Sequence, residues 1–305
     1  MLIAEPSVAG PEAERRLPPW IRVRPPQGTA YPEVRGLLSE LHLGTVCREA
    51  RCPNLPECWS AGAATLMLLG TECTRRCDFC SVTTRWPRGV VDRSEPRRVA
   101  EAVRRWGLRY VVLTQVCRDD LDDGGADLLA DTVREIRSVS PATRVELLIG
   151  DLGGSAEALR LVVEAEPDVL AHNLETTREL SGEVRDRRAG YDRSLGVLRG
   201  ARELGSRSLV TKSSIMLGLG ETAPSLERAL GDLRAAGVDL VTLGQYLRPS
   251  ARHRPVARFL PPEEFQRLAA VAEQLGFAGV ASGPLVRSSY RAEELYDRAR
   301  AARGG

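Results

Sequence analysis

The chain has 305 residues, 43% of them hydrophobic, and its 43 basic and 41 acidic residues leave a net charge of +2. This size and apolar content suit one main domain near the usual size of an α/β barrel, with short appendages. The near balance of charge argues against a nucleic-acid-binding surface as the main function, and no apolar run approaches the length of a membrane span.

The first segment, residues 1 to about 30, is rich in proline and alternates charged with small residues. We expect it to run extended over the surface. Its first 20 residues lack the apolar core of a signal peptide, and the seven cysteines of the chain are an odd number. Both observations argue against disulfide bonds and favour the cytoplasm, where oxygen-sensitive clusters can be assembled and reduced.

A helical pattern at 34–43 precedes the first of two cysteine arrays. This array has the spacing C-x4-C-x5-C and comprises Cys47, Cys52 and Cys58. Pro53 and Pro56 predict a looped ribbon rather than a regular helix, because a helix would set side chains five and six positions apart on different faces. A loop can fold three sulfur atoms around a metal cluster. The array then needs a fourth group or leaves one metal position open.

A strand pattern at 65–69 leads directly into the second array, which has the spacing C-x3-C-x2-C and comprises Cys73, Cys77 and Cys80. Each iron of a four-iron cubane needs an outer ligand, so three thiolates leave one iron open. The spacing resembles the signature of the radical S-adenosylmethionine (SAM) enzymes, in which SAM occupies that open iron and is cleaved to a radical. Structural zinc is a competing interpretation, but it usually takes two C-x2-C knuckles or Cys/His pairs, and no such pair of knuckles is present.

Beyond the arrays, strand patterns alternate with amphipathic helical patterns. Further strands are predicted at 109–114, 144–149, 168–173, from 206 onward and at 239–244. Helices are predicted between them at 96–106, 126–139, 155–166, 191–204 and 224–236. Six strand–helix units indicate an α/β fold, a partial (β/α)6 barrel similar to a TIM barrel.

Polar residues follow several of these strands, at the end where parallel barrels carry their chemistry. They are Arg118, Asp119, Asp120, Asn173, Glu175 and the glycine-rich L-G-L-G-E-T at 217–222. The tail at 291–305 has the pattern of a charged helix ending in Gly-Gly, and we expect a solvated cap. Lys212 is the only lysine beside 42 arginines, and its compact ammonium differs from the planar fork of arginine.

These motifs together resemble the lipoyl synthase family. The resemblance covers roughly residues 17 to 296 and rests on R-R-L-P-P-W, both arrays, G-L-R-Y-V-V-L-T, R-D-D-L-D-D-G-G-A, H-N-L-E-T, M-L-G-L-G-E-T, L-G-Q-Y-L-R-P-S and R-S-S-Y at 287–290. The second array alone would indicate only the radical SAM superfamily. The first array and the distant R-S-S-Y motif are much more specific.

By this resemblance, the two arrays hold two 4Fe–4S clusters, the second of which binds SAM. Ser289 would be the fourth ligand of the first, auxiliary cluster, whereas without the resemblance it reads as a turn hydroxyl. Asn173 and Glu175 would contact the SAM ribose or its amino-acid part, or else form a strand-end hydrogen-bond pair. Lys212 would face SAM or the substrate, and Phe79 would pack near the adenine or shield the cluster.

The resemblance implies a sulfurtransferase that inserts two sulfur atoms, at carbons 6 and 8, into an octanoyl chain on a lipoyl-carrier domain. The auxiliary cluster would donate the sulfur. The partners would be the E2 subunit or the glycine-cleavage H protein, and an electron donor such as ferredoxin or flavodoxin. We divide the chain into an N-terminal extension at 1–62, a barrel at 63–283 and a C-terminal extension at 284–305, and we expect the two extensions to carry the auxiliary cluster.

The chain departs from the family pattern at strand ends that face the predicted pocket. The departures are Gln115, Cys117, Gly150, Leu152 and Ser214. They remove a carboxylate, a proline and an aromatic residue and add a side chain, so a paralogue acting on another acyl or carrier-bound substrate is the alternative function. Neutral drift is the simpler explanation of these departures, and Cys117, the seventh cysteine, is expected to pack as a small hydrophobe.

Two other classes compete with this interpretation. An iron–sulfur electron carrier or redox sensor would explain the cysteines but not six strand–helix units with polar strand ends. A methylthiotransferase also carries two clusters, but it usually has an RNA-binding module, and no basic extension is present for one.

Overall fold

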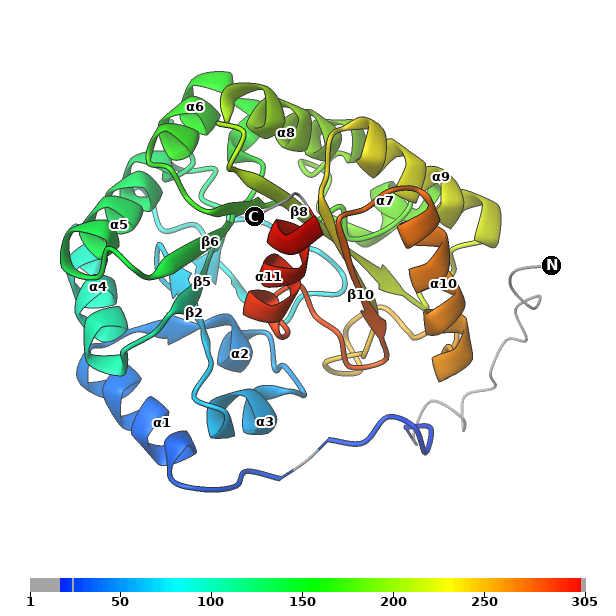
Figure 1. Ribbon diagram of the computed structural model, residues 1–305, viewed down its shortest axis with the longest axis horizontal. Helices are drawn as coiled ribbons and strands as arrows, with labels where there is room; N and C mark the ends of the chain where they lie inside the picture. The colour runs from blue at the N-terminus through cyan, green and yellow to red at the C-terminus, as the bar shows by residue number, and fades with distance from the viewer. Residues whose placement is uncertain (1–16, 24, 303–305) are drawn as a thin grey trace.

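The computed structural model describes residues 17–23 and 25–302, which form an open barrel of mostly parallel strands surrounded by helices (Figure 1). The main sheet has eight strands in the order β1-β2-β5-β6-β7-β8-β9-β10. Their bounds are β1 Gly44–Thr45, β2 Thr65–Leu68, β5 Tyr110–Gln115, β6 Arg144–Leu148, β7 Val169–Ala171, β8 Val210–Leu217, β9 Leu240–Gln245 and β10 Gly279–Gly283. Neighbouring strands are parallel except β1 and β2, which are antiparallel.

The predicted partial barrel is confirmed, because the six predicted strands correspond to β2 and β5 through β9. The sequence analysis missed a further parallel strand, β10, and the helix before it, α10 (Pro262–Gln274). β10 reads G-V-A-S-G. Small residues dominate it, and only Val280 is of the β-branched or aromatic kind that favours a strand, so the pattern carried little signal.

Helices cover the outer face of the sheet, as predicted. They are α4 Glu95–Trp106, α5 Ala126–Val139, α6 Ala156–Glu164, α8 Tyr191–Leu204 and α9 Ala223–Ala235. A short helix that was not predicted, α7 Arg178–Val184, lies between β7 and α8. In the part of the chain that the structure describes, no helix has the length and apolar character needed to cross a membrane.

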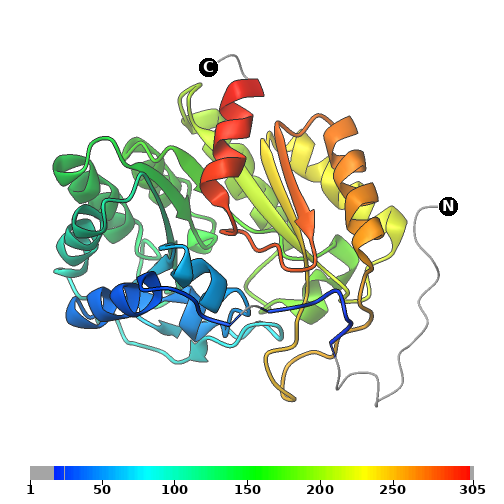
Figure 2. The ribbon, with the colours of Figure 1, turned by 60° about the horizontal axis from the view of Figure 1, so that its bottom comes forward.

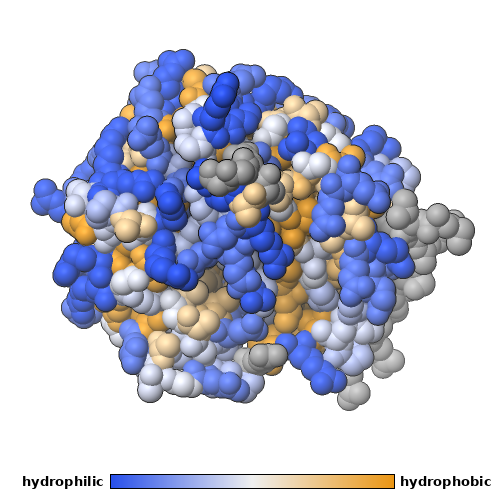
Figure 3. Space-filling model, in the orientation of Figure 1, coloured by the Kyte–Doolittle hydropathy of each residue, from blue (hydrophilic) through white to orange (hydrophobic). Residues whose placement is uncertain are grey.

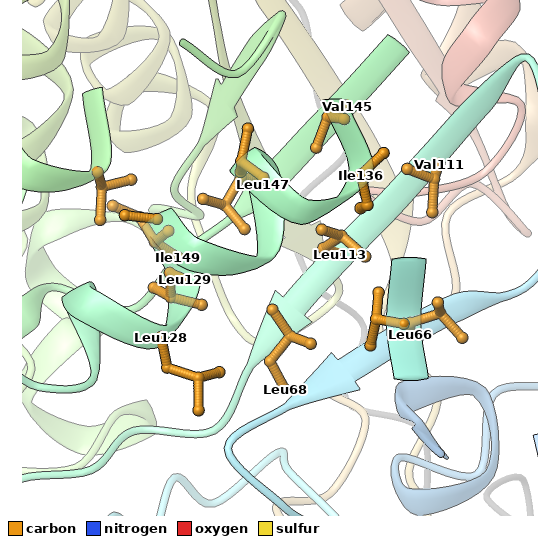
Figure 4. Close-up of a cluster of buried hydrophobic side chains, with 14 of the residues drawn as sticks. Leu66, Leu68, Val111, Leu113, Leu128, Leu129, Ile136, Val145, Leu147 and Ile149 are labelled. Carbon is orange, nitrogen blue, oxygen red and sulfur yellow. The ribbon is translucent and has the colours of Figure 1, made fainter. Parts of the chain in front are cut away.

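The main core lies between the strands and these helices (Figure 4). Leu68, Leu113 and Leu147 point outward from three neighbouring strands and are fully buried. They meet Leu129 and Ile136 of α5, which are also fully buried. Because side chains alternate along a strand, the residues between these leucines point into the barrel and can form a site.

The C-terminal helix, α11 (Ala292–Ala302), closes the base of the barrel. Leu295, Tyr296 and Ala299 lie on one helical face and are buried against Val169 and Val210 of the strands. The prediction of a solvated cap is therefore wrong, because the apolar residues recur at helical spacing among the charges. The last three residues of the predicted tail lie outside the described residues.

Figure 2 shows α11 at one end of the barrel and the loops that follow the strands at the other. The outer face around α11, seen in Figure 3, is largely hydrophilic with an apolar strip next to the helix. The base is thus covered, and the opposite end is left for the site.

The N-terminal extension contains α1 (Ala30–Glu40), α2 (Val46–Glu49) and α3 (Leu55–Ser60). The looped ribbon predicted for the first array is therefore a pair of short helices joined by a turn. Pro56 lies in the first turn of α3, where proline is tolerated because its missing N–H would have had no partner in the helix. The expectation of an extended N-terminus concerns mainly residues outside the described part.

Candidate active site

A cavity of about 580 Å³ lies at the carboxyl ends of the strands. The predicted site residues that line it are Cys47, Cys52, Cys73, Cys77, Cys80, Phe79, Asn173, Glu175 and Ser289. Cys58 and Lys212 were predicted for the site but are not among the lining residues. Residues from both extensions and from the barrel thus share one chamber.

The second array follows β2 and is held by a small two-stranded sheet of β3 (Glu72–Cys73) and β4 (Thr83–Thr84). Backbone groups already contact its sulfur atoms. The N–H of Arg75 donates to Cys73 Sγ at 3.4 Å, and the N–H of Asp186 donates to Cys77 Sγ at 3.3 Å. Hydrogen bonds to the sulfur atoms of an iron–sulfur cluster tune the reduction potential of the cluster. The backbone around this array already supplies two such donors.

Arg75 fixes this array to the ends of two neighbouring strands. Its guanidinium donates to both carboxylate oxygens of Asp119, after β5, at 2.7–3.1 Å. It also donates to both oxygens of Asp151, after β6, at 2.6 and 2.8 Å. Burial would raise the pKa of each carboxyl, but Arg75 holds both pKa values below the usual range. The charged network therefore positions the loop between Cys73 and Cys77.

The thiols of the second array differ in acidity. Burial raises the pKa of Cys77 to about 11 and that of Cys80 to about 12. Cys73 has a pKa lowered to about 7, because the Cys117 thiol donates a hydrogen bond to its thiolate. Cys117 is therefore a partner of a predicted ligand, whereas the sequence analysis expected only packing.

The first array occupies α2, the turn after it, and α3. Burial and, to a smaller extent, the nearby Cys52 and Cys47 raise the pKa of Cys58 to about 12. The three thiols are thus close enough to influence one another although Cys58 does not line the cavity. Among the described residues, no three His, Cys, Asp or Glu side chains converge on the position of a single metal ion. A cubane has a different requirement, because each thiolate binds its own iron.

The loop before α11 brings Ser289 beside the first array. Tyr290 donates its hydroxyl proton to Glu57 Oε1 on α3 at 3.0 Å, and Asn54 Nδ2 donates to the carbonyl of Leu285 at 2.5 Å. These two contacts link the R-S-S-Y segment to the α2–α3 region across more than 230 positions. Ser289 and Cys52 consequently line the same cavity.

Asn173 and Glu175 face the cavity from the chain after β7. Glu175 has a φ of 69°, a left-handed conformation that costs a side chain about 1 to 2 kcal/mol. Its N–H donates to Ser214 O at 3.0 Å and its carbonyl accepts from Met216 N–H at 2.9 Å, so β8 holds it in place. Burial raises the pKa of Glu175, opposed by Arg185 and by a hydrogen bond from Asn173.

Three buried polar atoms at the cavity have no hydrogen-bond partner among the described residues: Gln115 Oε1, Asn173 Oδ1 and Arg185 Nε. A buried polar group without a partner is costly. The two oxygens could accept hydrogen bonds from hydroxyl or amino groups of a bound molecule. Arg185 Nε could donate one to its carboxylate. The thiol arrays and these atoms together fit an iron–sulfur cluster with SAM.

Both Phe79 and Lys212 were predicted for the site, but only Phe79 lines the cavity. Phe79 lines the cavity and packs with Tyr246 and Leu219, so it is a wall of the chamber. Lys212 is 1% exposed and donates from Nζ to both oxygens of Glu146 at 2.7 and 2.9 Å. The structure therefore places Lys212 in a buried ion pair inside the barrel and not at the predicted SAM or substrate site.

Four of the five departures from the family pattern, Gln115, Cys117, Gly150 and Leu152, are neighbours in space. A Cβ added to Gly150 would lie 3.0 Å from Gln115 Nε2 and 3.2 Å from Cys117 Sγ. The missing side chain at 150 thus makes room for the two larger ones. All three also line a side pocket of about 300 Å³, with Leu152, next to the main cavity. Ser214, the fifth departure, lies on β8 and lines the main cavity.

Sequence reasoning missed several residues that build the site. Arg185 and His172 line the cavity, and the ring of His253 contacts the carbonyl of Cys80 at 3.1 Å through Nε2. Arg75 could have been found from the sequence, because it lies between Cys73 and Cys77 and acidic residues follow the neighbouring strands. Arg185 and His253 could not have been found in this way, because they lie in irregular loops whose placement depends on tertiary packing.

Comparison with known proteins points to one family. The radical SAM superfamily matches residues 67–233, and the N-terminal domain of lipoyl synthase of the radical SAM family matches residues 6–52. Lipoyl synthase from Pyrobaculum arsenaticum is 59% identical over 93% of this chain and 96% of the relative. Lipoyl synthase from Thermus thermophilus is 53% identical over 94% of this chain and 89% of the relative, and that from Mycobacterium tuberculosis is 55% identical over 94% and 91%.

Solved structures share the fold at low identity. Methylornithine synthase (PylB) has a TM-score of 0.55 at 17% identity and covers 80% of this chain and 73% of that chain. Coproporphyrinogen III oxidase (HemN) from Escherichia coli, a radical SAM enzyme, has a TM-score of 0.51 at 15% identity and covers 75% and 57%. These likenesses support the barrel architecture alone.

Proposed function

This chain belongs to the lipoyl synthase family of the radical SAM superfamily, and on that premise we propose that it inserts two sulfur atoms into an octanoyl chain. The insertions take place at carbons 6 and 8 of an octanoyl group amide-linked to a lysine of a lipoyl-carrier domain. The observation that supports this best is the single cavity that joins both cysteine arrays and Ser289.

We assign one 4Fe–4S cluster to each array. Cys73, Cys77 and Cys80 hold the cluster that binds SAM. Ser289 completes the ligand set that Cys47, Cys52 and Cys58 begin. When bound, these groups supply a SAM-derived radical and a source of sulfur, because side-chain acid–base chemistry cannot break an unactivated C–H bond. The serine oxygen is a hard donor among soft thiolates, so this corner of the site is the most easily released.

The polar residues of the cavity orient SAM. The buried Glu175 carboxyl, whose pKa burial raises, would accept a further hydrogen bond from the SAM amino group or a ribose hydroxyl. Asn173 Oδ1 would accept a second hydrogen bond from SAM, and Arg185 Nε would donate one to its carboxylate. These contacts would satisfy two of the polar atoms that have no partner within the described part of the chain.

Apolar residues between the two arrays receive the acyl chain. Met67, Val116, Leu148 and Ile149 line the cavity. Burying a methylene group contributes about 0.8 kcal/mol, so a chain of this length binds by apolar contact and leaves the polar atoms to SAM. The same contacts exclude water from the place where the radical forms.

The proposed partners follow from the reaction. The acyl chain arrives on a carrier domain, such as that of an E2 subunit or the glycine-cleavage H protein. Reduction requires an electron donor such as ferredoxin or flavodoxin. We assign the reaction to the cytoplasm, because both clusters need a reducing compartment.

Cluster content is the first test. Iron and acid-labile sulfide are counted on anaerobically reconstituted protein, on a variant with Cys73, Cys77 and Cys80 changed to Ala, and on one with Cys47, Cys52 and Cys58 changed to Ala. We expect about eight irons in the wild type and about four in each variant. Four irons in the wild type and none in the second-array variant would remove the proposed sulfur source.

Product formation is the second test. The reconstituted protein is incubated with SAM, dithionite and an octanoylated lipoyl-domain peptide, and the peptide is analysed by mass spectrometry. We expect addition of two sulfur atoms. SAM cleavage without a thiolated peptide would instead support the alternative substrate suggested by Gln115, Cys117 and Gly150. Restoring the family pattern with Gln115→Ser, Cys117→Asp and Gly150→Pro would then recover the product.

A further inference from the structure

The loop of the second array is held against the loop that follows α7. The N–H of Asp78 donates to the carbonyl of Val184, the last residue of α7, at 3.0 Å. The N–H of Asp186 donates to Cys77 Sγ at 3.3 Å, and the Asp186 carboxylate accepts from the N–H of Arg76 at 2.8 Å. Three contacts therefore fix these two loops side by side.

A third loop, after β9, reaches the same array. The N–H of Arg254 donates to the carbonyl of Asp78 at 3.0 Å. His253 Nε2 lies 3.1 Å from the carbonyl oxygen of Cys80, and because a carbonyl only accepts, this nitrogen carries the proton. Ser250 Oγ, at 2.9 Å, then donates to Nδ1. His253 is 7% exposed, so it lies just beneath the surface next to a ligand cysteine.

Each of these three loops carries an exposed arginine beside one of the contacts. They are Arg76, Arg187 and Arg252. Within residues 17–23 and 25–302, their guanidinium groups make no hydrogen bond or ion pair. Neighbouring arginines on the same loops are neutralised, since Arg188 pairs with Asp186 and Arg254 pairs with Glu183. Three exposed cations with all donors available therefore lie on the loops that contact the second array.

An exposed aromatic side chain lies near the same array. Trp86 is 51% exposed and follows β4, in which Thr84 pairs with Cys73. The N–H of Arg85 donates to the carbonyl of Cys73 at 2.9 Å, which fixes the segment. Tryptophan and arginine are the residues most often responsible for binding energy at protein interfaces.

We propose that this surface is the docking site of a small acidic electron-carrier protein, recognised by Arg76, Arg187, Arg252 and Trp86. The inference rests on the proposed function, in which the site at the second array gains one electron for each SAM cleaved and the carrier is oxidised by one electron. Acidic groups of the carrier pair with the three arginines, and Trp86 supplies apolar contact.

The position favours an electron carrier over the acyl-carrier domain. An electron must reach the second array, whose ligands Cys77 and Cys80 contact the arginine-bearing loops directly. His253 provides a short bonded and hydrogen-bonded route from the protein surface to Cys80. The acyl chain must instead reach the first array, which is formed by the two terminal extensions.

The test compares a docking variant with a charge-matched control. The docking variant carries Arg76→Glu, Arg187→Glu and Arg252→Glu. The control carries Arg160→Glu, Arg199→Glu and Arg207→Glu, which are exposed residues on α6, α8 and the loop after α8. Both variants have the same net charge, so any difference between them reports position. Both are reconstituted, and their iron content is matched to the wild type.

The measurement is the rate at which reduced flavodoxin reduces each reconstituted protein, followed by stopped-flow absorbance and electron paramagnetic resonance. At low ionic strength, we expect the docking variant to be slower than the control by about tenfold or more. The difference should shrink at about 0.5 M salt, because surface charges are screened. SAM cleavage driven by dithionite should be equal in both variants, since a small reductant needs no docking. Trp86→Ala should lower the rate of reduction by flavodoxin at both salt concentrations, because salt does not screen apolar contact.

Three results would overturn the proposal. One is equal flavodoxin rates for the docking and control variants. Another is a selective loss of dithionite-driven cleavage in the docking variant, which would make the arginines structural. The third is unchanged reduction together with weaker binding of an octanoylated lipoyl domain, which would assign the surface to the acyl carrier. Absence of cluster or of SAM cleavage in the wild type would contradict the proposed function itself.

Discussion

At the scale of single residues, Lys212 shows what a lone lysine can do that an arginine cannot. Its ammonium group lies between two oxygens of Glu146, and the Tyr110 hydroxyl donates to the same carboxylate at 2.6 Å. Both charged side chains are almost completely buried. A guanidinium is wider and planar, so the enclosed space favours the compact ammonium.

Lys212→Ala is expected to lower the free energy of unfolding by about 3 to 5 kcal/mol, because it leaves Glu146 buried without its counterion. Urea denaturation of the apo protein measures this. The double variant Lys212→Met and Glu146→Gln is the control, and it should recover part of the loss. Unchanged stability with weakened SAM binding would place Lys212 at the cofactor after all.

The thiols of the second array give a pH-dependent prediction. With pKa values of about 11 and 12, Cys77 and Cys80 stay protonated between pH 6 and 9, whereas Cys73, at about 7, becomes a thiolate as pH rises through neutrality. Iodoacetamide should therefore label Cys73 first in the apo protein, with a rate that rises around pH 7. Peptide mapping by mass spectrometry measures it.

Cys117→Ala provides the control for that experiment. Removing the donor thiol should raise the pKa of Cys73, so labelling at pH 7 should slow. Equal labelling of all three ligand cysteines in the unaltered protein would contradict the assigned acidities. The spacing in the sequence predicts that these three cysteines act together, but not this difference in acidity, because Cys117 meets Cys73 only through the pairing of strand ends.

At the scale of elements, Gly244 in β9 determines where the C-terminal loop can lie. A Cβ at this position would be 2.0 Å from the carbonyl oxygen of Val286 and 3.3 Å from Arg287 Nη1. The backbone of the R-S-S-Y loop therefore packs directly on the strand. Glycine is the residue that permits such a close approach.

Gly244→Ala is expected to displace the loop that carries Ser289. The iron content should fall from about eight toward four, and dithionite-driven SAM cleavage should persist, because the second array does not depend on this loop. Iron analysis and cleavage assays measure both. Gly231→Ala on α9 is the matched control, since a Cβ there meets nothing within 4 Å. Full iron content in Gly244→Ala would show that the loop tolerates the displacement.

Elements with a strong periodic pattern were predictable, and those with small or proline-containing segments were not. The apolar runs in the sequence predicted the strands β2, β5 and β6 directly. The turn containing Pro53 was expected to keep the first array irregular, yet two short helices flank it. The known backbone preferences of proline predict that it interrupts a helix, but they do not say on which side of it the chain becomes helical.

At the scale of the whole molecule, the barrel is an open sheet whose base depends on the last helix. Leu295 and Tyr296 are 3% and 5% exposed, and the ring of Tyr296 lies 5.7 Å from that of Tyr110. The sequence indicated the helix but not its partner, because a helix of mixed charge reads as solvent-exposed until its apolar face is placed.

Leu295→Ala is expected to lower the free energy of unfolding by about 2 to 5 kcal/mol through the lost contacts and the space left behind. Thermal unfolding of the apo protein, monitored by circular dichroism, reports it. Arg298→Ala, an exposed position on the same helix, should change the free energy by no more than about 0.5 kcal/mol. Equal effects at both positions would mean that α11 does not hold the base.

Because α11 covers the base of the barrel, molecules do not enter the cavity from that end. The acyl chain, each incoming SAM and the fragments left after cleavage all pass through the same cavity at the carboxyl ends of the strands. If one chain is modified twice, the debris of the first event must leave, and a fresh SAM must enter, while the half-modified chain still occupies the chamber or after it has withdrawn. Since both insertions use the cavity that joins the two arrays, the space left by the half-modified chain determines whether a fresh SAM enters before that chain withdraws.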